Sequence, residues 1–277
     1  MPRQFFAMVR VEILKVYTRG SGIGALIVAL LVPVFAVLAM HALMGMQDSA
    51  QFNGQPLRGF LQFDVVAVAG KALWARNFFV LPLLLFLATG ASVAGENADR
   101  TLRELMVRPV PRWSILAAKA IALWTLSAAT LAITFVGAVG LGWAFIGAPA
   151  IDQSVAEGSE SLLRLSLGYS ASFISDMALI AIGMALSSFV RSVGGVVASL
   201  ILVLLADRVV WLMLKGLGFV LQEEWPKTAV QWTLVGAMGC WENWETAFEP
   251  GQFVAVVAIT LGATAVAMLR FSRTDVP

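Results

Sequence analysis

Residues 95–120 read GENADRTLRELMVRPVPRWSILAAKA, a charged segment that separates two long apolar stretches of the chain. Eight of its side chains are charged, although only 13% of the whole chain is. Wound as a helix, the segment would gather apolar side chains on one face, because they recur after about one and two turns. These side chains are Ala98, Leu102, Leu105 and Met106. The pattern predicts a short amphipathic helix at the membrane surface, ended by Pro109 and Pro111 and placed to contact a soluble partner.

The composition around this segment is that of a membrane protein. Apolar residues make up 59% of the chain, against roughly 45–50% in soluble proteins, and the mean hydropathy is +0.84. The net charge of +2 is too small to suggest a nucleic-acid partner. The single cysteine, Cys240, excludes an intrachain disulfide, and the single histidine, His41, excludes a histidine-rich metal site.

Six apolar segments are long enough to cross a bilayer, which takes roughly 20 residues per helix. They are residues 22–46, 78–94, 115–141, 165–190, 194–220 and 253–269. An even number of spans puts both termini on one side of the membrane. The loops are too short to fold separately, so the sequence predicts an all-α polytopic membrane protein with a single transmembrane domain over residues 1–277.

Basic residues mark one side of this predicted membrane domain. Lys and Arg precede the first span, crowd residues 100–119 and follow the last span, whereas the loops on the other side are rich in Asp and Glu. Cytoplasmic loops are enriched in Lys and Arg. Both termini are therefore predicted to lie in the cytoplasm, with the chain in a bacterial-type inner membrane.

Two segments outside the spans carry their own patterns. Residues 1–20 are predicted to form an interfacial helix, and a simple orientation anchor is the alternative. Its apolar face is Phe5, Val9, Ile13 and Val16, with the Lys and Arg side chains elsewhere. Residues 221–251 are predicted to form an extracytoplasmic helical loop that dips into the outer leaflet or caps the outer mouth. An aromatic belt explains its tryptophans, Trp225, Trp232, Trp241 and Trp244, nearly as well.

The sequence lacks the motifs of the common hydrolases. It contains no G-x-x-x-x-G-K-[ST] phosphate loop, no H-E-x-x-H, no C-x-x-C and no G-x-S-x-G. The chain is therefore not expected to be an enzyme.

Three ionisable side chains, Asp176, Asp207 and Arg208, fall deep inside predicted spans. Ionisable groups there are costly and mark functional sites by default, although an ion pair that holds two spans together is the alternative to substrate contact. Asp207 and Arg208 are adjacent and point to different sides of a helix, so they cannot satisfy each other. Counted from Arg191 at about 1.5 Å per residue, Asp176 and Arg208 reach similar depths. We therefore expect these two to pair, within one subunit or between two copies of the chain.

The fourth predicted span gathers small and polar residues on one face. They are Gly168, Ser172, Asp176, Gly183 and Ser187. Such a face either lets another helix approach closely or forms a polar lining.

The charged segment resembles one family of transport proteins. Its Gly95-Glu96, Thr101-Leu102, Leu105, Pro109-Val110, Arg112 and Lys119 look like the segment after the second span in permeases of the type-2 family of ATP-binding-cassette (ABC) exporters. The family pattern runs G-E, G-T-L, two apolar residues, P-V-[ST]-R and a lysine that opens the third span. Here Arg100 stands in place of the glycine and Pro111 in place of the small polar residue. The six-span layout, the first helix and the outer helical loop are also similar.

This resemblance implies a transport subunit that works with other chains. Two permeases, here expected to be a homodimer in the lipid bilayer, would each dock on a cytoplasmic ABC ATPase, which would bind ATP and Mg²⁺ itself. This chain would then hold no cofactor and no metal. Residues 95–113 would be the cytoplasmic coupling segment, with a short coupling helix at residues 97–106 and Glu96 at its junction with the second span. The residues implied in ATPase coupling are Glu96, Asp99, Arg100, Leu102, Arg103, Glu104, Leu105, Arg108 and Arg112.

Other functions stay open at this point. The family exports lipids, polysaccharides, peptides, drugs or ions, or supports metal-cofactor assembly, and the acidic outer loop leaves room for a periplasmic accessory protein. An autonomous secondary transporter or channel would instead use Asp176, Asp207 and Arg208 as an ion relay. An intramembrane enzyme or assembly factor is the third class, without a catalytic constellation to support it.

Overall fold

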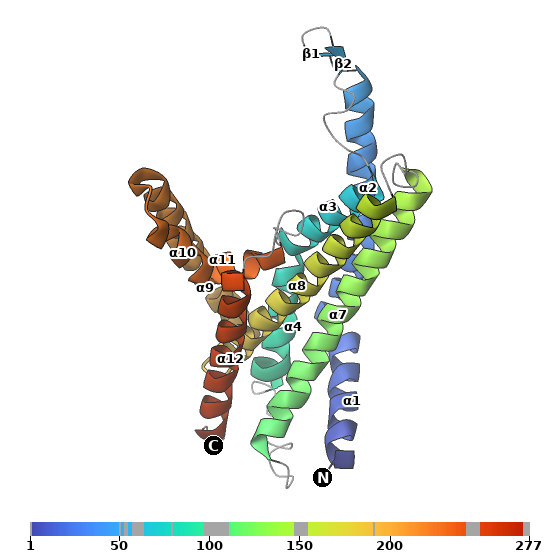
Figure 1. Cartoon of the computed structure of the whole chain (residues 1–277). Helices are drawn as coiled ribbons and strands as arrows, with labels where there is room; N and C mark the ends of the chain where they lie inside the picture. Colours follow the sequence, from blue (N-terminus) through green and yellow to red (C-terminus); the bar gives the residue numbers. More distant parts are fainter. Residues whose placement is uncertain are drawn as a thin grey trace.

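The computed structural model describes residues 2–49, 51–52, 55–56, 64–78, 80–96, 111–146, 155–190, 192–241 and 250–273. These residues are almost entirely helical, and the two termini lie at the same end of the molecule (Figure 1). The α-helices are α1 (Pro2–Thr18), α2 (Gly20–Ser49), α3 (Val65–Phe78), α4 (Val80–Gly90), α7 (Arg112–Phe145), α8 (Val155–Ser187), α9 (Val193–Leu221), α10 (Glu224–Trp232), α11 (Leu234–Met238) and α12 (Pro250–Arg273). A π-helix covers Ala91–Gly95, a 3₁₀-helix covers Gly239–Trp241, and the two-residue strands β1 (Gln51–Phe52) and β2 (Gln55–Pro56) pair antiparallel.

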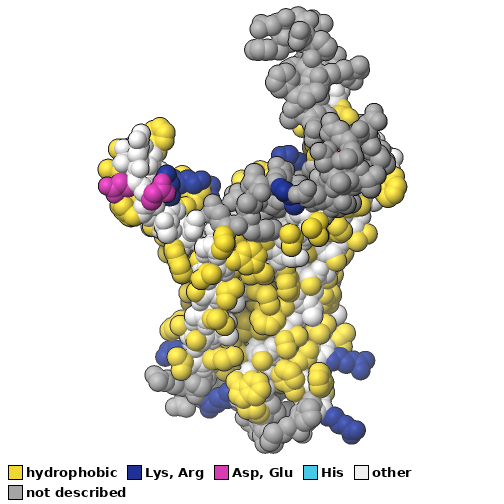
Figure 2. Space-filling view, viewed as in Figure 1, with side chains coloured by type: hydrophobic (Ala, Val, Ile, Leu, Met, Phe, Trp, Pro, Cys, Tyr) yellow, Lys and Arg dark blue, Asp and Glu magenta, His cyan; other side chains and the backbone are white. Residues whose placement is uncertain are grey.

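Helices long and apolar enough to span a membrane occur where the sequence predicts them in five of six places. They are Gly20–Gly45, Arg112–Phe145, Leu163–Ser187, Val193–Leu221 and Pro250–Phe271. The fold is therefore the predicted all-α polytopic one. Apolar side chains cover the middle of the face in Figure 2, and Lys and Arg side chains lie towards its ends.

The second predicted span differs from its prediction. It is a broken pair of helices, Val65–Phe78 and Leu81–Gly95, which meet at 44° and begin at Val65 rather than at Phe78. Pro82 accounts for the break, because a proline ring clashes with the carbonyl four residues earlier, here that of Phe78, and has no N–H to donate to it. Arg76 therefore belongs to the second span, whereas the sequence prediction left it in a loop.

The first two helices run along α7 in the same direction (Figure 1). Near the start of α1 and of α7, the rings of Phe5 and Trp113 lie 6.5 Å apart. Farther along α7, Thr134 Oγ1 donates a 3.3 Å hydrogen bond to Ala29 O on α2. The helix predicted at residues 1–20 is confirmed, with Val16 buried on its predicted apolar face. Its place in the bilayer interface stays a prediction.

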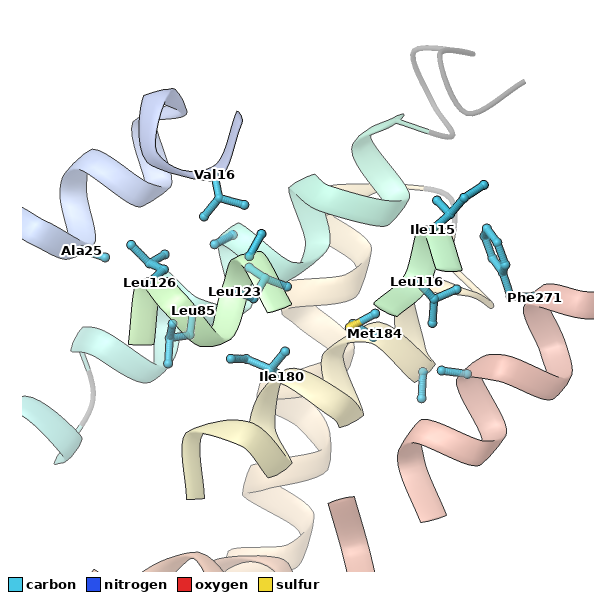
Figure 3. Close-up of a cluster of buried hydrophobic side chains, with 14 of the residues drawn as sticks. Val16, Ala25, Leu85, Ile115, Leu116, Leu123, Leu126, Ile180, Met184 and Phe271 are labelled. Atoms are coloured by element: carbon cyan, nitrogen blue, oxygen red, sulfur yellow. The ribbon is translucent and has the colours of Figure 1, made fainter. Parts of the chain in front are cut away.

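One of the described hydrophobic cores lies where six helices meet (Figure 3). Its members include Val16, Ala25, Leu85, Leu123, Ile180 and Phe271, one each from α1, α2, α4, α7, α8 and α12. Lipid chains are as apolar as these side chains, so close packing rather than removal from water holds such a core together. Gly183 allows that packing, because a Cβ there would lie 2.8 Å from Cγ2 of Thr89 on α4.

The loop before the last span folds back into the helical bundle. Ser175 Oγ, near the middle of the α8 span, donates to the carbonyl of Met238 over 2.9 Å. Ala237 and Cys240 are buried, and only 9% of Trp241 is exposed, whereas Trp225 and Trp232 are each 53% exposed. The described part of this loop is helical and packs among α8, α9 and α12. Its place on the outer side of the membrane stays a prediction. Trp244 lies outside the described residues.

Candidate functional site

A buried ion pair joins α3 to α8 in the middle of the bundle. Arg76 Nη2 lies 2.7 Å from Asp176 Oδ2, and the two side chains are 0% and 5% exposed. Ser127 Oγ on α7 donates to the same carboxylate oxygen over 2.6 Å. Removing two charges from water costs several kcal/mol each, so such a pair persists only where further hydrogen bonds satisfy it.

Neutral polar side chains supply those hydrogen bonds. Arg76 donates to Thr130 Oγ1 over 3.1 Å, to Ser172 Oγ over 3.3 Å and to Asn77 Oδ1 over 2.6 Å. Asn77 Nδ2 in turn donates to Ser172 Oγ over 2.7 Å. Among the described residues, Nε of Arg76 has no hydrogen-bond partner. The network joins α3, α7 and α8 at one level, so these helices cannot slide past one another without breaking it.

The predicted pair between Asp176 and Arg208 is wrong. Asp176 pairs with Arg76, while Arg208 is exposed and lies over the ring of Trp211, 4.3 Å from its centre. Counting depth along two helices does not say which way each side chain points around its helix axis. The face of small and polar residues predicted on α8 packs against other helices. Gly183 lies close to Thr89 on α4, and Ser172 accepts a hydrogen bond from Arg76 on α3.

Asp207 has a structural role. Its carboxylate accepts hydrogen bonds from the backbone N–H of Leu234 over 2.9 Å and of Val235 over 2.6 Å. These donors open α11, where a helix has no internal acceptor for them. Backbone at membrane depth must find partners within the protein. Both carboxylates of the predicted ion relay therefore have partners within the chain, Asp176 in an ion pair and Asp207 on the backbone of α11.

A second cluster of charges, called here the ion network, lies where α1, α4 and α7 meet. Lys119 Nζ on α7 contacts Glu12 Oε2 at 2.8 Å and Glu96 Oε2 at 2.6 Å. All three side chains are buried. Lys15 Nζ contacts the other oxygen of each glutamate, at 3.0 Å for Glu12 and 3.1 Å for Glu96.

Arg19 completes the ion network from the end of α1. Its guanidinium donates to the carbonyl of Ala91 over 2.5 Å and lies 3.5 Å from Glu96 Oε1. Three positive charges thus surround two negative ones. Glu96 immediately precedes residues 97–110, and Lys119 lies about two turns inside the helix that follows them. Both ends of the predicted coupling segment are therefore tied to α1.

The ion network shifts the pKa values of Glu96 and Lys15 in opposite directions. Burial raises the pKa of Glu96, but the charges and hydrogen bonds of Lys119 and Lys15 outweigh burial and hold this pKa below its ordinary value of 4.5. Burial lowers the pKa of Lys15, but Glu12 and Glu96 outweigh it and raise this pKa above 10.5. The part of the stability due to Glu96 is therefore present above pH 4.5 and is lost as pH falls through the lowered pKa.

Most of the predicted coupling residues lie outside the described residues. They are Asp99, Arg100, Leu102, Arg103, Glu104, Leu105 and Arg108. Of the two that are described, Glu96 lies at the centre of the ion network and Arg112 is an exposed first residue of α7.

Comparison with known proteins decides the family. The model of the ABC-2 family transporter proteins matches residues 8–206. The chain belongs to this ABC-2 transporter family. A comparison with curated proteins finds no significant match. The match includes the ion network, the Arg76–Asp176 pair and the coupling segment, and it ends inside α9.

Membership makes this chain a multi-pass membrane protein of the ABC permease type, as the resemblance implied. ABC-2 permeases generally lack their own ATPase site and imply an ABC ATPase partner. The missing phosphate loop agrees with this division of labour.

Sequence reasoning missed two of the buried charges, although each left a signal. Glu12 falls between Val9 and Val16 on the apolar face of the first helix, where an acid needs a cation. Arg76 lies six residues before Pro82, and a span broken near that proline extends back over Arg76. Lys15 and Arg19 were expected to point away from the apolar face, and both contact Glu96 instead.

Proposed function

We propose that this ABC-2 permease is the membrane subunit of an exporter and that residues 97–106 carry movement of a separate cytoplasmic ATPase into the spans. The observation that supports this proposal is the ion network. Its contacts tie the residues on both sides of the segment to α1, so a push on the segment reaches α1, α4 and α7 together. The broken second span then links Glu96 at one end to Arg76, which is bound to α7 and α8.

We also propose that the working unit holds two copies of this chain and two ATPases. Helix α9 supports this, because only 11% of its most apolar stretch is buried, against 67% for α8. Leu202, Leu205, Val209 and Leu212 are all exposed on it. Their three- and four-residue spacing is that of a helix that packs against a copy of itself. Arg208 on the same helix is a charge that membrane proteins turn towards protein rather than lipid.

Variants of the coupling segment test the proposed role. Arg103→Glu, Glu104→Lys and Leu102→Asp are expected to lower transport and permease-stimulated ATP hydrolysis about fivefold or more, the usual range of coupling between sites. The measurement is ATPase activity and substrate efflux in proteoliposomes that hold permease and ATPase. Glu157→Lys, a charge reversal in a predicted outer loop, is the matched control. Normal transport in all three coupling variants would reject the role.

Single-cysteine labelling tests the orientation of the chain. Cysteines at Arg3, Arg103 and Arg273 are expected to be shielded from an impermeant thiol reagent in intact cells, and cysteines at Glu157 and Glu245 to react. The wild-type protein is the background control, because its Cys240 is buried. Labelling of positions 103 and 157 from the same side would contradict six spans with cytoplasmic termini.

A further inference from the structure

A polar cavity lies between the ends of α9, α10 and α12, away from both charge clusters. Its volume is about 850 Å³, within the range of about 300–1,000 Å³ typical of ligand sites. In Figure 2 acidic and basic side chains lie next to each other at the upper left, over the end formed by α9 and α10 in Figure 1. None of the functions above uses this cavity.

The lining favours an anion. Lys215 and Lys227 supply two ammonium groups and Gln222, Gln231 and Gln252 supply three amides, while no carboxylate belongs to the described lining. Lys215 Nζ lies over the ring of Trp211, 4.0 Å from its centre. Lys227 pairs with Glu224 at 2.7 Å, but both side chains are more than half exposed. Such a surface ion pair contributes little to stability, so another anion can replace Glu224 beside the ammonium group of Lys227.

One detail of the lining indicates a ligand site. It is not the left-handed conformation of Gln222 (φ 54°, ψ 21°), which is a common way for a helix to end. Gln252 Oε1 is buried and has no hydrogen-bond partner among the described residues. A buried acceptor without a donor is costly, so this oxygen calls for a hydroxyl from a ligand.

The surroundings of the cavity are those of a membrane interface. Next to it, α9 exposes 86% of Phe219 and 75% of Val220, and α10 exposes Trp225 and Trp232. Tryptophans gather at the level of lipid headgroups, and exposed apolar side chains beyond them suit acyl chains. The occupant therefore combines an anionic group, a hydroxyl and apolar chains.

We propose that this cavity binds the headgroup of an anionic phospholipid that carries hydroxyls, with its phosphate on Lys215 and Lys227 and a hydroxyl donated to Gln252. Phosphatidylglycerol has this chemistry. Lipid binding at this cavity does not require the ATPase, so the proposal can be tested independently of the exporter role.

Lipid binding to the purified full-length protein tests the charge. Native mass spectrometry would compare phosphatidylglycerol with phosphatidylcholine on wild type, on the double variant Lys215→Gln with Lys227→Gln, and on Lys71→Gln as an exposed-lysine control. The double variant is expected to lose about tenfold in phosphatidylglycerol binding, since each lysine near the surface attracts anionic lipid, while the control keeps it. Equal binding of the two lipids by wild type, or an equal loss in the control, would overturn the proposal. Helicity and melting temperature check that each variant is folded.

Two further arms test the hydroxyl and the source of the phosphate. Wild type is expected to prefer phosphatidylglycerol to phosphatidylmethanol, which has the same charge and no headgroup hydroxyl, and Gln252→Leu is expected to abolish the preference. A Gln252→Leu protein that keeps the full preference would reject the assigned hydroxyl contact. Inorganic phosphate should not displace the lipid at millimolar concentration. Displacement by phosphate would show a site for the free ion instead.

Discussion

Replacing Arg76 with methionine is expected to destabilise the protein by about 3–5 kcal/mol, because it leaves the buried carboxylate of Asp176 without its cation. Asp176→Leu should cost a similar amount, since it strands the guanidinium. The measurement is reversible unfolding in detergent micelles or bicelles. Arg10→Met, which removes an exposed arginine from α1, is the matched control and should change stability by less than about 0.5 kcal/mol.

The double variant separates the pair from its two members. Replacing both Arg76 and Asp176 by apolar residues removes the charge as well as its partner, so much of the single-variant loss should return. The non-additive part measures the interaction between the two side chains. Losses that simply add would show that Arg76 and Asp176 act independently despite their 2.7 Å contact.

Replacing Lys119 with methionine is the second change with a large expected effect. Lys119 contacts both Glu12 and Glu96, so its loss strands two buried carboxylates at once. We expect a loss of at least about 3 kcal/mol in stability and uncoupling of transport from ATP hydrolysis, because α7 is no longer held to α1 and Glu96. Lys15→Met should do less, since the side chain of Lys15 is 37% exposed and solvent screens its contacts.

A charge exchange keeps this prediction falsifiable if Lys119→Met fails to fold. Glu12→Lys combined with Lys119→Glu restores one ion pair across α1 and α7 and preserves the total charge of the ion network. The combination should recover part of the stability and transport lost in Lys119→Glu alone. Recovery of stability without recovery of transport would mean that the ion network holds the fold and carries no coupling.

The spans could be predicted from sequence because each needs only a length of apolar residues, and five of the six matched. The second span could not, since its first half contains Arg76 and its break depends on a clash between Pro82 and the preceding turn. A hydropathy average over the sequence shows neither that the charge of Arg76 is paired inside the bundle nor that the helix breaks near Pro82.

The candidate site was predictable in kind and not in detail. The buried position of Asp176 correctly predicted that its carboxylate needs a cation. Counting depth along the helices then selected Arg208, because such counting does not say which helices become neighbours. Asp207 was expected either to pair with a charge on another span or to contact substrate. Its partner is instead the backbone of a loop that the sequence shows only as aromatic and weakly apolar. The family resemblance of the charged segment at residues 95–120 was recognisable because its residues are adjacent in sequence.

The buried pair also dictates an order of events during synthesis. Arg76 leaves the ribosome 100 residues before Asp176, which at about 5–20 residues per second is a delay of roughly 5–20 seconds. Through that interval the nascent chain contains an arginine whose carboxylate has not yet been made. The Arg76–Asp176 pair can therefore form only after α8 has been translated, so the contact that joins α3 to α8 belongs to a late stage of folding.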